Sequence, residues 1–119
     1  MKNRYITEMG MGTDVHGSDH TVAAERAVFD AIHHSSLHFF THLGKSAKDM
    51  QIDLMIGVPD PDSVDRAKVA KALPYGTVSV NVCKGGLEIP TEDVYSIIIA
   101  NAGVIVNFNE TCYINGKFL

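Results

Sequence analysis

Residues 94–108 constrain the fold most, because this segment is apolar at both of its alternating positions. Its apolar or small side chains are Ile98, Ala100, Ala102, Val104 and Val106 at even positions, and Ile97, Ile99, Gly103 and Ile105 at odd positions. Successive side chains of a strand point to opposite faces, so a strand with this pattern is covered on both. We therefore expect residues 94–108 to form a long strand in a sheet that is packed on both sides.

Two earlier segments alternate as half-buried strands do. Residues 50–58 carry apolar side chains at even positions, with Gln51 and Asp53 between them. Residues 77–83 carry valines at every second position. Residues 5–9 are a further expected strand, which runs into a glycine-rich segment.

Two segments carry helical signals. Ser18, Asp19 and Thr21 are candidate N-caps of a first helix, which reaches residues 35–36. Its apolar stripe at helical spacing is formed by Ala24, Ala27, Val28, Ala31 and Ile32. The Pro-Asp-Pro-Asp sequence at 59–62 ends the strand before it and predicts a short second helix over residues 63–72.

The histidines after the first helix share one face only if that helix continues, with Gly44 ending it. These residues are His34, His38 and His42. A solvent-exposed or interfacial histidine face is expected there rather than a metal site. Asn115-Gly116 predicts a type I′ turn near the C-terminus.

The expected order is β-α-β-α-β-β in a single domain over residues 1–119. This is an α/β (α+β) fold, a mixed sheet with two helices on one face. Two helices cover only one face of a sheet of four or more strands. The simplest way to cover the other face is to pack a second copy of the chain on it, so a homo-oligomer is expected.

Composition excludes several classes of partner. The net charge is −4 with no basic run, which argues against nucleic acid. No apolar run approaches the roughly 20 residues that span a bilayer, so no membrane partner is expected. Residues 1–9 lack the apolar region of a secretory signal, and Cys83 and Cys112 form no disulfide framework. A cytoplasmic location is the expectation.

The stretch from Gly10 to Gly17 reads Gly-Met-Gly-Thr-Asp-Val-His-Gly. Asp14 and His16 are two residues apart, so in an extended segment both point to the same side. They are the candidate catalytic pair, an orienting carboxylate and a general acid–base. Gly10, Gly12 and Gly17 are candidate substrate-binding positions, where backbone N–H groups could hold an anion or a carbonyl. The alternative is a loop held by Asp14 accepting backbone N–H bonds, with His16 at its rim.

A metal site is a second alternative for this stretch. Asp14, His16 and His20 offer oxygen and nitrogen ligands that suit zinc or manganese. Their spacing fits no established metal motif. We therefore expect no metal and no cofactor, and His20 is then a solvated residue at the start of the helix.

Lys84, Gly85 and Gly86 form the second candidate substrate-binding segment. Glycines within a strand often mark a bulge or a close backbone approach. The lysine could place its ammonium beside a bound substrate. The alternative is a structural bulge with a solvated lysine.

The pattern Gly10-x-Gly12-x-Asp14-x-His16-Gly17 resembles the GxGxDxHG motif that defines a small family of conserved hypothetical proteins. All five motif positions match, and the likeness extends to the segment from Gly85 to Pro90. The family has no assigned activity. The resemblance therefore implies a site without naming its reaction.

At the level of the fold, the chain is similar to the trimeric chorismate mutases and YjgF-like proteins, and to the repeats of cyanuric acid hydrolase and barbiturase. The likeness rests on the element order and on Gly85-Gly86-Leu87. It implies a homotrimer with small-molecule ligands bound between subunits. In the hydrolase a serine nucleophile precedes the Gly-Gly pair, whereas Lys84 stands there in this chain.

Two functions follow as expectations. The first is a small-molecule enzyme that uses Asp14 and His16 at a subunit interface, with a hydrolytic or ring-opening reaction on a small polar compound as the class implied by resemblance. The second is a non-catalytic protein that binds a small ligand or regulates through the same glycine segment. A catalytic His16 should face a cleft, with Asp14 within hydrogen-bond reach of it or of a common ligand.

Overall fold

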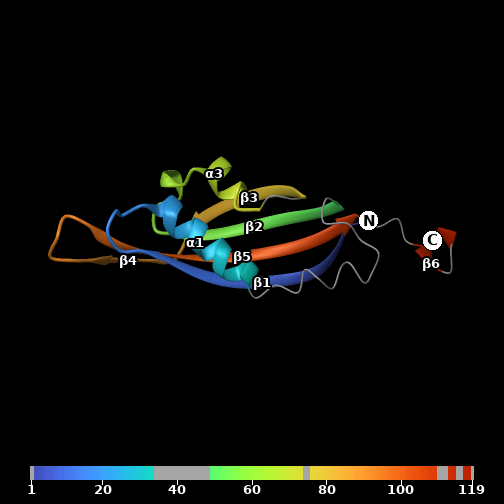
Figure 1. Cartoon of the computed structure of the whole chain (residues 1–119), viewed down its shortest axis with the longest axis horizontal. Coiled ribbons are helices and arrows are strands. Elements are labelled where there is room, and N and C mark those ends of the chain that lie inside the picture. The colour runs from blue at the N-terminus through green and yellow to red at the C-terminus, as the bar shows by residue number, and fades with distance from the viewer. Residues whose placement is uncertain (1, 34–48, 74–75, 110–112, 115–116, 119) are drawn as a thin grey trace.

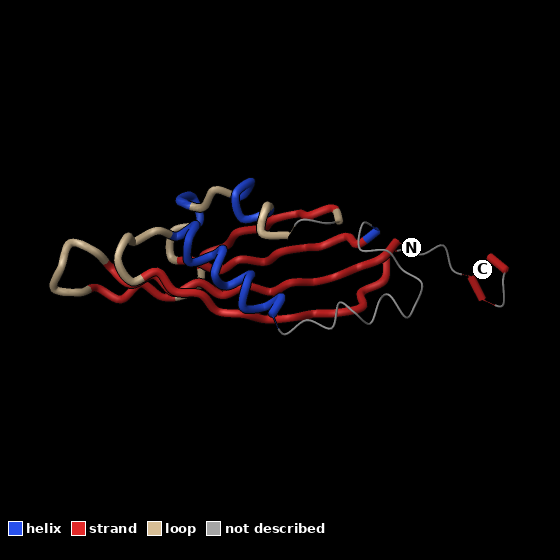
Figure 2. The backbone as a smooth tube through the Cα atoms, in the orientation of Figure 1, coloured by secondary structure: helices blue, strands red, loops and turns tan. Residues whose placement is uncertain are grey.

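One mixed sheet organises the chain in this computed structural model, which describes residues 2–33, 49–73, 76–109, 113–114 and 117–118. Its strands lie in the order β1 (Lys2–Asp14), β5 (Ser96–Asn109), β2 (Met50–Val58) and β3 (Thr77–Lys84). The short β4 (Leu87–Pro90) pairs with β5 beyond the end of β2. Figure 2 shows the strands side by side, with the β4–β5 hairpin projecting from one end.

Strand β5 pairs antiparallel with β1, β2 and β4, while β2 and β3 are parallel. Strands β1, β2 and β3 therefore run in the same direction. Their carboxyl ends meet at one edge of the sheet. Strand β5 has a neighbour on each side in the plane of the sheet, but the helices of this chain cover only one of its faces, so the predicted covering of its second face stays a prediction.

Both helices lie on one face of the sheet, as the sequence predicts. Helix α1 (His20–His33) crosses β1 and β5, and α3 (Arg66–Ala70) packs beside β3 after a 3-10 turn, η2 (Pro61–Ser63) (Figure 1). The even-numbered side chains of β2 and β5 meet these helices and form the core. Its largest fully buried members include Met50, Ile52, Leu54, Ile56, Ile98 and Val28. The predicted α/β class with two helices on one face is confirmed.

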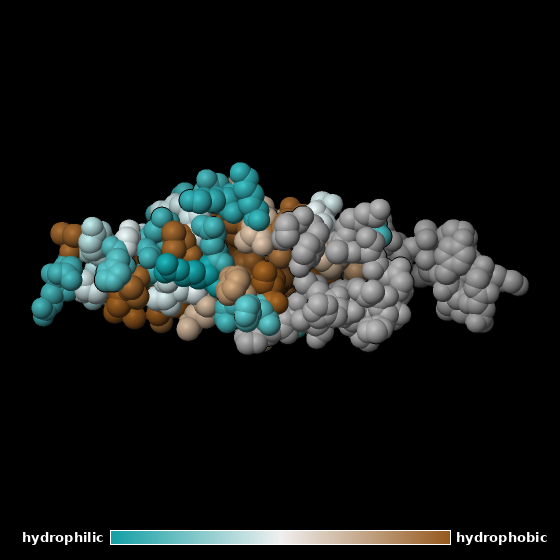
Figure 3. Space-filling view, viewed as in Figure 1, coloured by the Kyte–Doolittle hydropathy of each residue, from teal (hydrophilic) through white to brown (hydrophobic). Residues whose placement is uncertain are grey.

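Polar side chains cover much of the outer surface of the helices, with Phe29 of α1 as an exposed apolar side chain among them. Figure 3 shows hydrophilic residues gathered over α3, on the side of the molecule that carries both helices. In the described part of the chain, no helix combines the length and apolar character needed to cross a membrane.

Three predicted boundaries are wrong. The first strand does not end at Met9 but continues through the glycines to Asp14, because it stays paired with β5 up to Ile98. The predicted helix over 63–72 is divided, because Val64 adopts an extended conformation that buries its side chain, and Asp65 then caps α3. The last strand begins at Ser96 rather than at residue 94.

Other predictions hold or fall outside the described residues. The strand over 50–58 is confirmed, and β3 matches the predicted 77–83 with one more residue. Asp19 is confirmed as the N-cap of α1, since its side chain accepts a hydrogen bond from Val22 N–H at 3.1 Å. Two short strands pair near the C-terminus, β6 (Tyr113–Ile114) and β7 (Lys117–Phe118). The Asn115-Gly116 turn, and the histidines at 34, 38 and 42, lie outside the described residues.

Candidate functional site

The candidate site lies at the edge of the sheet where β1, β2 and β3 end. Their last residues are Asp14, Val58 and Lys84, and the connections that follow contain most of the predicted site residues. In open α/β sheets, ligands bind outside the carboxyl ends of the strands. The topology therefore gathers the predicted residues at an edge suited to a ligand.

Asp14 fixes the loop between β1 and α1. Its side chain is buried, with 8% of the residue exposed, and Oδ2 accepts hydrogen bonds from the backbone N–H groups of Gly17 at 3.2 Å and Asp19 at 2.9 Å. The guanidinium of Arg26 lies 3.6 Å from Oδ1 and balances the charge. Charge-assisted bonds of this kind are stronger than neutral ones. Asp14 therefore positions the loop and the start of α1.

Ser18 ties the same loop to the start of β5. Its hydroxyl donates to the carbonyl of Ser96 at 3.2 Å and accepts from the N–H of Ser96 at 2.8 Å. Ser18 has a φ of 50°, which is uncommon for a residue with a Cβ. With the Asp19 cap, these bonds hold the loop from both ends.

His16 is exposed on this fixed loop. None of the loop hydrogen bonds described above involves its imidazole. Asp14 uses Oδ2 for backbone N–H groups, which is the geometry of the structural alternative for this residue. The loop thus presents an imidazole at the carboxyl edge without using it to hold the fold.

Gly10 and Gly12 lie within β1 and face α1. A Cβ at Gly12 would overlap the backbone of Ala23 and Ala27, and one at Gly10 would overlap the backbone of Ala27 and Ala31. The absence of two side chains therefore lets the helix rest directly on the strand. This packing accounts for the two glycines, and the predicted substrate contact remains a prediction.

The close helix also covers the outer edge of β1. The Asp30 carboxylate accepts a hydrogen bond from the N–H of Met11 at 3.0 Å, and the Arg26 guanidinium donates to the carbonyl of Thr13 at 2.6 Å. An edge strand with free backbone groups can pair with another chain. Two side chains of α1 occupy such groups here.

Gly85 and Gly86 carry the chain from the end of β3 across the end of β2 to the side of β5. Gly85 N–H donates to the carbonyl of Val58 at 2.9 Å. Gly86 has a φ of +62°, and a Cβ there would overlap the carbonyl of Ile99. Both the positive φ and the lack of room for a Cβ require glycine at position 86.

The crossing brings the two predicted glycine segments to the same level of the sheet. Gly12 pairs with Ala100 on one side of β5, and Leu87 pairs with Ile99 on the other. Two strand spacings, about 10 Å, separate the segments. Lys84 is exposed at the end of β3, three spacings or about 14 Å from β1, so the two candidate segments lie well apart within one chain.

The described residues form no arrangement that supports the metal alternative. Among them, no group of three or more His, Cys, Asp or Glu side chains is placed to hold a metal ion. His20 is buried rather than solvated, with 9% exposed, and its Nε2 has no hydrogen-bond partner in the described part of the chain. The prediction of a solvated His20 is wrong, because this first residue of α1 is buried.

Sequence reasoning missed Ser18, Ser96 and Arg26 as parts of this site. Ser18 and Ser96 are 78 residues apart, so no local pattern links them. Arg26 reaches Asp14 only because α1 lies so close to β1. The alternation of glycines with Asp14 was the one available signal for that closeness.

The chain belongs to the Lin0512 family of conserved hypothetical proteins, whose pattern matches residues 4–106. The prediction of an uncharacterised family is thereby confirmed. Among solved structures, the chain is similar to an FtsZ-like protein of unknown function from Nostoc punctiforme, with 32% identity and a TM-score of 0.84. That match covers 92% of this chain and 98% of the other. No curated protein matches the chain.

Proposed function

We propose that the protein binds a small polar molecule at the carboxyl edge of the sheet, with the His16 imidazole as the principal contact. One observation supports the proposal above others. Asp14, Ser18 and Asp19 hold the loop by hydrogen bonds at both ends, and His16 stands exposed between them. A fixed loop presents a contact group with little loss of conformational entropy on binding.

Binding takes precedence over catalysis in this proposal because of the Asp14 geometry. A catalytic pair needs the carboxylate to orient the imidazole or to share a ligand with it. Asp14 instead accepts two backbone N–H groups and faces Arg26. The hydrolytic or ring-opening reaction on a small polar compound is the second candidate, since an exposed imidazole can transfer protons near neutral pH.

The resemblance to chorismate mutase, YjgF-like proteins and the cyanuric acid hydrolase repeat adds an assembly to the proposal. It implies a homotrimer with the ligand between subunits. A trimer would allow Lys84, Gly85 and Gly86 of one copy to approach the His16 loop of the next. The 14 Å between β1 and β3 in one chain supports that arrangement.

The His16→Ala variant tests the proposal in a thermal-shift screen of small polar compounds. We expect wild-type protein to be stabilised by a ligand and His16→Ala to lose at least about tenfold in affinity, roughly 1.4 kcal/mol. The melting temperature without ligand should change little, because exposed side chains contribute little to folding.

The matched control is His33→Ala, at the other end of α1. His33 is also exposed, and its ring centroid lies 4.7 Å from that of Phe29. This variant should bind the ligand as wild type does. Equal binding by wild type and His16→Ala would refute the proposed site.

A further inference from the structure

The face of the sheet opposite the helices, here called the open face, carries the odd-numbered side chains of β5, β2 and β3, and those of β1 from Thr7 onward. The strand register places them in rows across the sheet. One row consists of Met9, Gly103, Met55 and Asn81, and the next of Met11, Asn101, Gly57 and Cys83. Leu87 and Ile89 of β4 extend the face beside Ile99 and Ile97.

Large apolar side chains on this face are exposed to solvent. Met9 is 77% exposed, Met11 57% and Leu87 60%, and Met55 and Ile89 each exceed 40%. From Thr7 of β1 onward, and on the other four strands, Asp53 is the one charged side chain on the open face, and it accepts a hydrogen bond from the Asn107 amide at 3.1 Å. Exposed apolar side chains without charge are typical of the core of a protein–protein interface.

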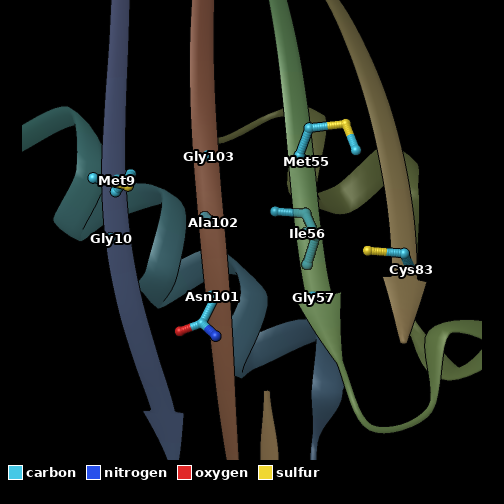
Figure 4. Close-up of a pocket in the computed structure, with 9 residues that line it drawn as sticks. All are labelled: Met9, Gly10, Met55, Ile56, Gly57, Cys83, Asn101, Ala102 and Gly103. Carbon is cyan, nitrogen blue, oxygen red and sulfur yellow. The ribbon is translucent and has the colours of Figure 1, made fainter. Parts of the chain in front are cut away.

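A groove of about 330 Å³ lies in the middle of the open face. Gly103 forms a notch between Met9 and Met55, and Gly57 forms a second notch between Asn101 and Cys83. Figure 4 shows the side chain of Met55 on β2 and that of Cys83 on the neighbouring β3, with Gly57 past Ile56 along β2 and opposite Cys83. The face therefore combines protruding side chains with recesses.

We infer that the open face binds the open face of a second copy of this chain, with the protruding methionines of one copy seated in the glycine notches of the other. Knobs and recesses on one surface make that surface complementary to itself, as a two-fold contact between identical subunits requires. The central rows of the face carry a single charge and so meet their own copy without repulsion. This contact makes a dimer, is separate from the homotrimer that the resemblance implies, and does not depend on the ligand of the His16 loop.

The area of the face is sufficient for such a contact. Four strands about 4.8 Å apart, over seven residues at about 3.3 Å, give roughly 450 Å² before β4 is added. With β4, two facing copies cover on the order of 1,000 Å², the lower bound for a specific interface. A small apolar molecule would occupy only the groove and leave Met11, Leu87 and Ile89 exposed.

Light scattering of the full chain at micromolar concentration tests the inference. We expect twice the 12.9 kDa mass of the chain, and a shift toward the single-chain mass in Met11→Glu. The control is Phe29→Glu on α1, where an equally exposed apolar side chain (59%) lies on the helix side. Wild-type protein at 12.9 kDa, or equal dissociation of both variants, would overturn the inference.

Gly103→Val tests the notch itself. An added Cβ at Gly103 would meet only the Met55 Cβ, at 3.8 Å, so the single chain has room for it. Filling the notch should weaken association by about tenfold or more, the effect of overpacking a fitted contact. Circular dichroism should show an unchanged fold. A folded Gly103→Val variant that associates as wild type does would overturn the seating of methionine in the notch.

Discussion

Two pairs of glycines lie on opposite faces of the same sheet and meet opposite surroundings. Gly10 and Gly12 face α1, where a Cβ would overlap helix backbone. Gly57 and Gly103 face away from the helices, and the nearest atoms to an added Cβ are 3.5 Å and 3.8 Å away. The first pair is required for folding, because the helix occupies the space. Gly103 leaves space that folding of one chain does not fill, whereas the backbone of Gly85 and Gly86 lies within contact distance of Gly57.

The same contrast applies to the polar groups near each pair. On the helix side, Asp14 accepts two backbone N–H bonds, and Asp30 and Arg26 occupy the outer edge of β1. On the open face, the described residues offer exposed apolar side chains. The helix side has its contacts within the chain, and the open face is suited to contacts from outside it.

The largest expected effect is that of Gly12→Ala. One methyl group would force α1 away from β1, so we expect a loss of roughly 3 kcal/mol or more in the free energy of unfolding. Urea denaturation followed by circular dichroism measures it. Stability within about 0.5 kcal/mol of wild type would remove the distinction between the two pairs of glycines.

Asp14→Ala tests the polar contacts on the helix side of the sheet. The substitution removes two hydrogen bonds to Gly17 and Asp19 and leaves the Arg26 guanidinium without its carboxylate. We expect a loss of about 1–3 kcal/mol in unfolding free energy, measured in the same denaturation experiment. His16→Ala serves as the neighbouring control and should lose far less. If the two variants are equally stable, Asp14 does not hold the loop.

The smallest effect is expected for Gly103→Ala on the open face. Alanine fits without overlap and lowers the entropy of the unfolded chain, so stability should stay equal or rise by up to about 1 kcal/mol. The experiment needs dilute protein, so that association does not contribute to the measured stability. A clear destabilisation would mean that the open face is as closely packed as the helix side.

Much of the fold could be predicted from local patterns. Alternation placed the strand over residues 50–58, and the candidate N-caps Ser18, Asp19 and Thr21 placed the start of α1 to within a few residues. Boundaries failed where a tertiary contact prevailed over a local signal. The glycines at 10 and 12 suggested the end of a strand, yet pairing with β5 and packing by α1 keep that segment extended. Val64 leaves a helical pattern because its side chain enters the core.

The candidate site was partly predictable for the same reason. Asp14 and His16 stand out in the sequence, because a carboxylate and an imidazole between glycines are a chemical signal. The sequence could not predict that Asp14 holds the loop while His16 stays exposed, because this depends on which N–H groups lie near the carboxylate after folding. The bond between Ser18 and Ser96 joins residues that meet only when the start of β5 reaches the β1–α1 loop.

The sequence by itself determined the class of fold, the two helices on one face and the surplus of apolar residues on β5, because side-chain periodicity directly records which faces are buried. Only the tertiary structure decided which glycines are pressed against a helix and which line an open groove. The residue type is the same in both places. The difference comes from what lies within 4 Å of a missing side chain, and distant segments of the chain supply those atoms.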